Sequence, residues 1–571
     1  MRVVHAASGT IYGFWQGLPA CVTLVIVPPA MTFQFDLPAP DANAKRAFST
    51  AKECADWLDA LPLTNAATAQ MQLRNQLEGL ARGGLKLGVL FEILEALREP
   101  FGFVQTEMAK KFVHRALPLS ELELASRNNS LAAWQAYRTA ALVCLQSLLD
   151  GSRDLKGAAA TVCHRAIDAH VRMMIDEART NSEASAADWT MLHAIYRAAE
   201  SLGVEAEKVK DPLSREAPVT NCMAVYGQPV LVTLGSYNEW NARQAQQILR
   251  WLERWSTKIT VSATPPASPV KPPVLTDVLS DRGGFRSQEG DAAPAAGTRY
   301  LDIGDLSLSI KNRVILLRKG ETPVNLGLGE DCVMPACEQQ LIQLYQHWCD
   351  GRVDRNQVRR PASGDALVGV GMEVMHYYLS GKPFKQPGVA TELSSKQRAE
   401  IATFGRIATR DDDEYSQMQG FTLEQWQLRD ESLAGMRLAR AKGVRGQRIS
   451  PGTLLAVRAG SAKGFMLASV RWIQWLNDDA IMAGVRSIPG IPTPAAVRQT
   501  GLNAVNEKYL QGFLVPAVEM LKSPDTVLMP AGWFKPGKVI EVYTDKAWRI
   551  TLIDVVERGG DFERCTYGGA P

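Results

Sequence analysis

Apolar residues recur every three or four positions along most of the first half of the chain. Leu87, Leu90, Ile93, Leu94 and Leu97 form one such stripe, which is typical of a helix with one buried face. Turn and capping residues separate successive stripes, as in PLTN, EPFG, LPLS and DGSRD. No fixed period is evident, and stacked helical hairpins of the tetratricopeptide type stay an open arrangement. The pattern predicts an all-helical domain over residues 31–256, with helices at 44–61, 66–82, 87–100, 131–149, 158–178, 189–203 and 241–255.

The helical pattern stops at about residue 257. Pro, Gly, Ala and Ser dominate residues 257–297, as in TPPASPVKPP, and this composition is typical of a flexible or extended linker. We therefore expect the main domain boundary there. Residues 298–350 predict strands and turns over 300–328, and then one amphipathic helix in PACEQQLIQLYQHWCDG that ends at Gly351.

Short alternations of apolar and polar residues fill the C-terminal half. They predict a long strand from Leu367 to Leu379 and further strands in EQWQLRD, MRL, TLLAVRA, FMLASVRWIQWL and AIMAGVRSI. Such strands, bounded by turn residues, favour a small antiparallel barrel over 351–500 that contains a helix-prone insertion. The pattern over residues 501–571 predicts either a β-subdomain or strands that extend the barrel. The predicted strands at 300–328 are candidates to complete this β-structure. The expected fold class is therefore α+β with several domains.

Composition narrows the class of protein. A chain of 571 residues has room for about three or four domains. Its net charge of +3 gives no reason to expect nucleic acid or an anionic membrane as a partner. Nine widely spaced cysteines do not resemble a disulfide framework, which favours a reducing compartment. No apolar run reaches transmembrane length, so we expect a cytoplasmic protein without membrane insertion.

The first thirty residues differ from the rest. GLPACVTLVIVPPA is a short apolar run with only Arg2 as a basic flank, which makes a poor secretory signal. We favour the interpretation that residues 1–30 are an extension from a start assigned too far upstream and that the protein begins at Met31. MTFQFDLPAPDANAK has the composition of an ordinary N-terminal arm.

The sequence gives little support for a metal site or for a catalytic site. His164 and His170 are six apart on one helix, a spacing that does not place them on the same face. Cys337, His347 and Cys349 share one predicted helix and, with Cys332, match no zinc signature. We expect core cysteines, a surface histidine, and neither a metal nor a cofactor. No Gly-rich phosphate loop or nucleophile–base pair appears, so we do not expect an enzyme.

One motif carries functional information. Asp430-x-Ser432-x-x-Gly435 lies between two predicted strands, downstream of a basic cluster at the start of the barrel, and a VRW…GVR strand pair follows it. This arrangement resembles the PilZ domain, the bacterial receptor module for cyclic di-GMP, over roughly residues 350–498. The resemblance implies a barrel that binds this nucleotide and has no catalytic role.

The residue types suit such a ligand. A planar guanidinium clamps a phosphate with two hydrogen bonds, lies on a base, or pairs with the O6/N7 edge of guanine. An aspartate accepts from guanine N–H groups, a serine offers a hydroxyl, and a glycine lets the backbone turn sharply and approach the ligand closely. The candidate ligand-binding residues are Arg355, Arg359, Arg360, Asp430, Ser432 and Gly435, with Arg406 and Arg410 as a second arginine pair.

The choice between the arginine pairs stays open. Arg355 and Arg359 stand where the family has its arginines, just before the first strand, and we favour them. Arg406 and Arg410 lie at a family-like distance from Asp430 but inside the insertion. The acidic run at 411–414 also tends to repel a phosphate from Arg410.

Two functions follow from these expectations. The leading hypothesis is a cyclic di-GMP receptor that couples nucleotide binding at the barrel to a helical domain that binds an unknown protein partner. The alternative is a ligand-free scaffold, in which a PilZ-like barrel and the helical domain both dock proteins.

Overall fold

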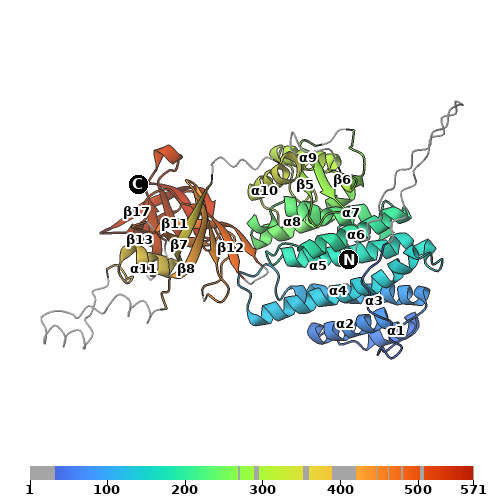
Figure 1. Ribbon diagram of the computed structural model, residues 1–571. Helices are drawn as coiled ribbons and strands as arrows, with labels where there is room; N and C mark the ends of the chain where they lie inside the picture. Colours follow the sequence, from blue (N-terminus) through green and yellow to red (C-terminus); the bar gives the residue numbers. More distant parts are fainter. Residues whose placement is uncertain are drawn as a thin grey trace, which may run out of the picture.

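The structure consists of a helical domain followed by two β-barrels that lie beside each other (Figure 1). A small sheet and two further helices, α9 (Gly304–Arg318) and α10 (Ala336–Tyr345), pack on one end of the helical domain. The computed structural model describes residues 33–267, 270–287, 295–351, 359–388, 420–444, 446–460, 462–476, 480–501 and 507–569.

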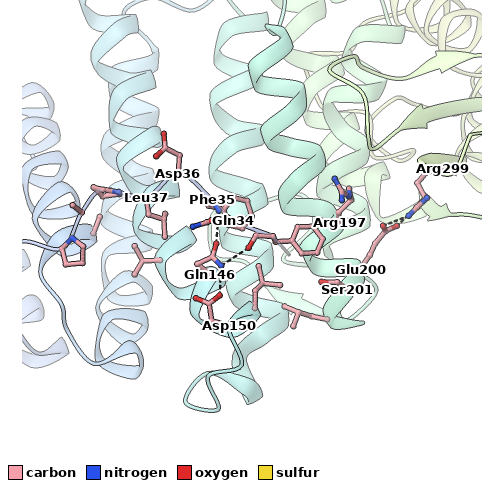
Figure 2. Close-up of a pocket in the computed structure, with 18 residues that line it drawn as sticks. Gln34, Phe35, Asp36, Leu37, Gln146, Asp150, Arg197, Glu200, Ser201 and Arg299 are labelled. Atoms are coloured by element: carbon pink, nitrogen blue, oxygen red, sulfur yellow. Dashed lines mark hydrogen bonds and ion pairs between the residues drawn. The ribbon is translucent and has the colours of Figure 1, made fainter. Parts of the chain in front are cut away.

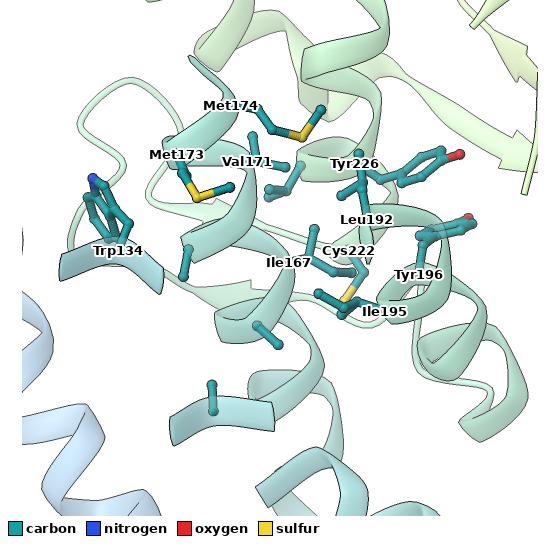
Figure 3. Packing of buried hydrophobic residues seen from close by; sticks show 14 of the residues in the cluster. Trp134, Ile167, Val171, Met173, Met174, Leu192, Ile195, Tyr196, Cys222 and Tyr226 are labelled. Carbon is teal, nitrogen blue, oxygen red and sulfur yellow. The ribbon is translucent and has the colours of Figure 1, made fainter. Parts of the chain in front are cut away.

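The helical domain is organised around α5 (Ala159–Ala178), which is buried on most of its surface. Its apolar side chains Ile167 and Val171 pack against residues of the neighbouring helices, including Leu192 and Tyr226 (Figure 3). His164 and His170 are fully buried in this core. The helices of the domain are α1 (Ala51–Asp59), α2 (Ala66–Arg82), α3 (Leu87–Ala109), α4 (Glu121–Leu149), α5, α6 (Ala186–Leu202), α7 (Cys222–Leu234) and α8 (Ala242–Trp255), and a short ladder joins β1 (Val209–Lys210) to β2 (Val219–Thr220).

Local capping explains where several of these helices begin. The Thr50 side chain accepts from the Glu53 amide, so α1 begins at Ala51 rather than at residue 44. Ser120 forms a capping box with Glu123 and starts α4 ten residues before its predicted first residue. The predicted break at EPFG was wrong, because α3 continues through Pro100 while its buried face extends to Met108.

The predicted linker is part of a folded sheet. Its strands follow the order β3-β6-β4-β5, and Val274 and Leu301 bury against the helical core. The described parts of 257–297 are therefore not a spacer between domains, and the chain passes to the barrels after residue 351 instead. The strands are β3 (Thr260–Ser262), β4 (Val274–Asp277), β5 (Phe285–Arg286) and β6 (Thr298–Asp302).

The prediction of strands and turns over 300–328 was wrong for residues 304–318. These residues form α9 (Gly304–Arg318), because Leu306, Ile310 and Leu317 are buried at helical spacing against the core. The predicted amphipathic helix is α10 (Ala336–Tyr345) with a π turn after it, and the chain leaves it at Gly351 in a left-handed conformation.

The cysteines and histidine of this region also differ from expectation. Cys332 and Cys337 are five residues apart with their Cα atoms 5.2 Å from each other, and they form a disulfide. The cysteines are buried, as expected for core residues, but His347 is 9% exposed and is not a surface residue. No group of potential metal ligands is found among the residues that the structure describes. Within the same residues, no helix is both long and apolar enough to cross a membrane.

The first barrel closes in the order β10-β11-β12-β9-β8-β7, with all neighbours antiparallel. The predicted strand from Leu367 to Leu379 ends early, since Gly371 turns the chain at a φ of 93° into α11 (Met372–Ser380). The strands are β7 (Arg360–Val370), β8 (Glu424–Ser432), β9 (Gly435–Arg440), β10 (Leu454–Ala459), β11 (Met466–Trp475) and β12 (Ile481–Ser487).

The helical domain contributes to the core of this barrel. Leu117, which precedes α4, is fully buried among the barrel's inward-facing residues. Its amide donates to the Ile449 carbonyl at 2.8 Å, and the Ile449 amide donates back at 2.9 Å. A second contact joins the domains where the Trp475 amide of β11 donates to the Asn181 carbonyl at 2.8 Å.

The C-terminal residues form a complete second barrel. It closes in the order β13-β14-β15-β18-β17-β16 and starts at Thr493, so the last part of the range predicted for the first barrel belongs to the second. No strand from 300–328 is needed to complete either barrel. The strands are β13 (Thr493–Gln499), β14 (Leu510–Val515), β15 (Thr526–Pro530), β16 (Val539–Tyr543), β17 (Ala547–Arg558) and β18 (Phe562–Gly569).

Candidate functional site

The signature motif forms the tight hairpin between β8 and β9. Ser432 pairs directly with Gly435, so only Leu433 and Ala434 make the turn. The Ser432 hydroxyl donates to the Gly435 carbonyl at 3.3 Å. Leu433, at the tip, is 80% exposed. The hairpin thus places the motif at one end of the barrel, opposite the end that Leu117 enters.

Asp430 is the acidic centre of this region. Its carboxylate is nearly buried, and it accepts from Arg359 Nη1 at 2.7 Å through Oδ1. Its second oxygen, Oδ2, lies 2.7 Å from Nε of Arg437 on β9. The two arginine side chains are about two-fifths exposed, at 42% and 41%. One carboxylate therefore holds two guanidinium groups at the barrel surface, where both can meet a ligand.

A row of paired residues extends from Asp430 across the outer face of the barrel. Asp430 pairs with Arg437, Arg437 with Gly484, and Gly484 with Trp472 on β11. A Cβ on Gly484 would lie 2.0 Å from Nε1 of Trp472, so the indole lies directly over this glycine. The row therefore presents an acid, an arginine and an aromatic ring side by side.

Gly435 has a packing role. A Cβ at this position would lie 2.0 Å from the Val485 carbonyl oxygen of the paired strand β12. Its φ is not in the left-handed region, so the position needs glycine for the close approach of two strands. The sharp turn that we expected at this glycine is made by Leu433 and Ala434 instead.

The structure brings together four of the predicted residues, which are Arg359, Asp430, Ser432 and Gly435. Arg360 is exposed and pairs in register with Glu431, next to Asp430, whereas the ion pairs found for Asp430 are with Arg359 and Arg437. The candidates Arg355, Arg406 and Arg410, and the acidic run at 411–414, lie outside the described residues.

Arg437 and Trp472 were missed from the sequence. Arg437 lies at an outward position between the inward-facing core residues Met436 and Leu438, and Trp472 lies at an outward position just before the core residue Ile473. An outward Trp opposite a Gly on the next strand is the signal that points to them, but it requires the strand register. Bulges after Leu428 and Val470 shift that register, and simple alternation does not predict them.

A six-stranded barrel that carries this hairpin beside a basic entry segment is a PilZ-like module. Here it is part of a larger protein with a helical domain before it and a second barrel after it.

Comparison with known families agrees with this description. Residues 52–267 match the family described as "Cyclic-di-GMP receptor FimW, N-terminal domain", and residues 495–569 match the "FimW C-terminal beta-barrel domain". The matched segments together cover about half of the chain, and the signature hairpin lies between them. A curated relative, the cyclic-di-GMP receptor FimW of Pseudomonas aeruginosa, is 21% identical over 540 residues and is matched over 86% of each chain.

The chain belongs to the FimW family. The predicted resemblance to cyclic di-GMP receptors is confirmed at the level of the family, as is the fold class of a helical domain followed by a β-rich half.

Proposed function

We propose that the first barrel binds cyclic di-GMP on the outer face around the β8–β9 hairpin. The observation that carries the proposal is the contact between Arg359 and Asp430 at 2.7 Å, since it joins the two separated parts of the signature in one place. The membership of a family whose curated relative is a cyclic-di-GMP receptor supports the same ligand.

The chemistry of the face fits the parts of such a dinucleotide. Arg359, Arg360 and Arg437 supply guanidinium groups for the two phosphates or the O6/N7 edge of a guanine. Asp430 accepts from guanine N–H groups, and the Trp472 ring offers a stacking surface for a base. Because Asp430 holds two arginines, one of them can turn to the ligand while the other keeps the nearly buried carboxylate paired.

We further propose that the helical domain binds a protein partner. An open hollow of about 1280 Å³ lies between the segment 33–40 and the ends of α4 and α6 (Figure 2). The Phe35 amide donates to the Gln146 side chain at 2.9 Å, and Gln146 donates to the Phe33 carbonyl at 3.1 Å. The Gln146 side chain thus holds the backbone of an extended segment of this chain against the helices. In the proposal, an extended segment of the partner would bind to this surface in the same way.

The proposed role is binding without turnover, in the cytoplasm, with neither a metal nor nucleic acid involved. Its test is calorimetric titration of the full chain with cyclic di-GMP, using Asp430→Ala and Arg359→Ala as site variants. Asp365→Ala is a matched control, because this exposed carboxylate of β7 bonds to Gln425 on the same barrel. Loss of binding in both site variants, with the control unchanged, supports the proposal.

A titration of the wild-type chain that shows no heat and no thermal shift at high ligand concentration would refute the receptor function. The ligand-free scaffold would then be the better description of the protein.

A further inference from the structure

A second row of paired residues crosses the outer face next to the first. Ser432 pairs with Gly435, Gly435 with Arg486 on β12, and Arg486 with Ser469 on β11. Gly435 has no side chain, so nothing at that position separates Arg486 from the Ser432 end of the row. Arg486 also lies diagonally beside Arg437, two residues from its partner Gly484 and on the same face.

The second barrel contacts this row. Glu557 of β17 lies with Oε2 2.6 Å from Nη2 of Arg486. Its other oxygen, Oε1, accepts from the Ser469 hydroxyl at 2.7 Å. The Glu557 side chain is 9% exposed, whereas that of Arg486 is 44% exposed. An arginine beside the signature motif is therefore held by a buried carboxylate from another domain, yet it keeps an open side toward solvent.

Further charges surround this contact. Burial, and then the neighbouring charge of Arg486, lowers the pKa of Arg471, while Glu557 and Glu239 of the helical domain act in the opposite direction. Positive charges are therefore crowded near Glu557. If Arg486 turned away, the Glu557 carboxylate would still accept the hydrogen bond from the Ser469 hydroxyl and would still be attracted by the positive charge of Arg471. The loss of the ion pair with Arg486 therefore does not leave this carboxylate unpaired.

We propose that Arg486 is a further ligand-binding arginine of the site, for which the dinucleotide and Glu557 compete. The inference rests on the proposed function and extends it. Arg486 would add a cation toward a ligand with two phosphates, beside Arg359, Arg360 and Arg437. Because the ligand and the second barrel share one guanidinium group, binding of the ligand weakens the contact between the barrels, and by linkage that contact weakens ligand binding.

If the ligand and Glu557 compete for Arg486, substitutions of Arg486 and of Glu557 should change the affinity for cyclic di-GMP in opposite directions. Full-length wild type, Arg486→Gln and Glu557→Gln are titrated with cyclic di-GMP by calorimetry. Arg486→Gln should bind roughly tenfold more weakly, the size expected for one charge-assisted hydrogen bond. Glu557→Gln should bind a few-fold more tightly, because the competitor of the ligand has lost its charge. A purely structural ion pair would make both variants change in the same direction.

Arg498→Gln is the matched control. Arg498 pairs with Glu541 inside the second barrel, so its loss removes a comparable ion pair without touching the shared row. Its affinity should equal that of wild type. Circular dichroism melts show whether each variant is folded. Hydrogen exchange gives a second readout, since ligand should reduce protection at 553–558 in wild type but not in Arg486→Gln.

The same measurements distinguish a failure of the competition from a failure of the proposed receptor function. If wild type binds and Asp430→Ala does not, but Arg486→Gln and Glu557→Gln both match wild type or both weaken, the competition is refuted and the receptor function stands. If wild type does not bind, the proposed function fails and the competition falls with it.

Discussion

Gly435→Ala tests whether the signature glycine acts through packing or through the ligand. The added Cβ would lie 2.0 Å from the Val485 oxygen and 3.2 Å from the Arg486 Cα. Side-chain Cβ atoms essentially never lie within 3.0 Å of such neighbours, so β9 and β12 would have to separate by about 1 Å. The obstacle is the backbone of a paired strand, which cannot rotate away. We expect a cost of about 1–3 kcal/mol, as for an overpacked core.

The effect should be local, so the measurement should be local as well. A multidomain chain does not unfold in a single step, and a global melting temperature is a poor readout. Native-state hydrogen exchange at 435–440 and 481–487 reports the opening of these two strands. A loss of 1–3 kcal/mol corresponds to protection lower by between about 5-fold and about 150-fold. Gly464→Ala is the control, because its added Cβ meets nothing within 4 Å.

Ligand affinity completes the test. Arg437 lies two residues after Gly435 on β9, so the separation of β9 from β12 should also displace this guanidinium and weaken cyclic di-GMP binding. Unchanged protection together with lost binding would refute the packing argument. In that case Gly435 would serve the ligand directly, as the motif alone suggests.

Three further predictions concern stability, each measured by chemical denaturation followed with a probe local to the domain. Leu117→Ala should cost about 2–5 kcal/mol in the first barrel, because this fully buried side chain belongs to its core, and a loss below 1 kcal/mol would contradict that packing. Glu424→Gln should cost about 3–5 kcal/mol, since it leaves buried Arg440 without its ion-pair partner at 2.9 Å; equal stability would refute the charged pair. Burial, and then Asp188, raises the pKa of Glu177 to about 7, so folding favours its neutral form and stability falls between pH 4.5 and pH 7. Glu177→Gln should therefore exceed wild type by at most about 3 kcal/mol at pH 8 and match it near pH 4, whereas a constant difference would exclude this titration.

Sequence patterns located the signature because its parts are local. Asp430, Ser432 and Gly435 lie within six residues, and a two-residue hairpin places them together wherever the barrel forms. Arg359 was also found, since it lies just before the first strand. Arg437 and Trp472 were not found, because their places depend on which residues pair across three strands. The bulges that set this register involve only one extra residue each.

Composition was misleading where strands are very short. The strands of 257–297 contain two to four residues, too few to show alternation, so the Pro-rich loops between them dominated the interpretation. Only burial against the helical core, as at Val274, reveals a folded sheet. In α9 the run LSLSI alternates like a strand, yet Leu306 and Ile310 bury four residues apart and the segment is a helix.

Strand β11 connects the proposed site to both neighbouring domains. Ser469 near its start bonds to Glu557 of the second barrel, and Trp475 at its end bonds to Asn181 of the helical domain. Trp472, the proposed stacking surface, lies between them. A strand in a closed barrel is hydrogen-bonded on both sides, so it moves as a unit rather than residue by residue. Arg486 belongs to the neighbouring strand β12 and pairs with Ser469 of β11. A ligand that contacts Trp472 and Arg486 would therefore act on a strand that contacts both neighbouring domains, which gives binding a physical route to the helical domain.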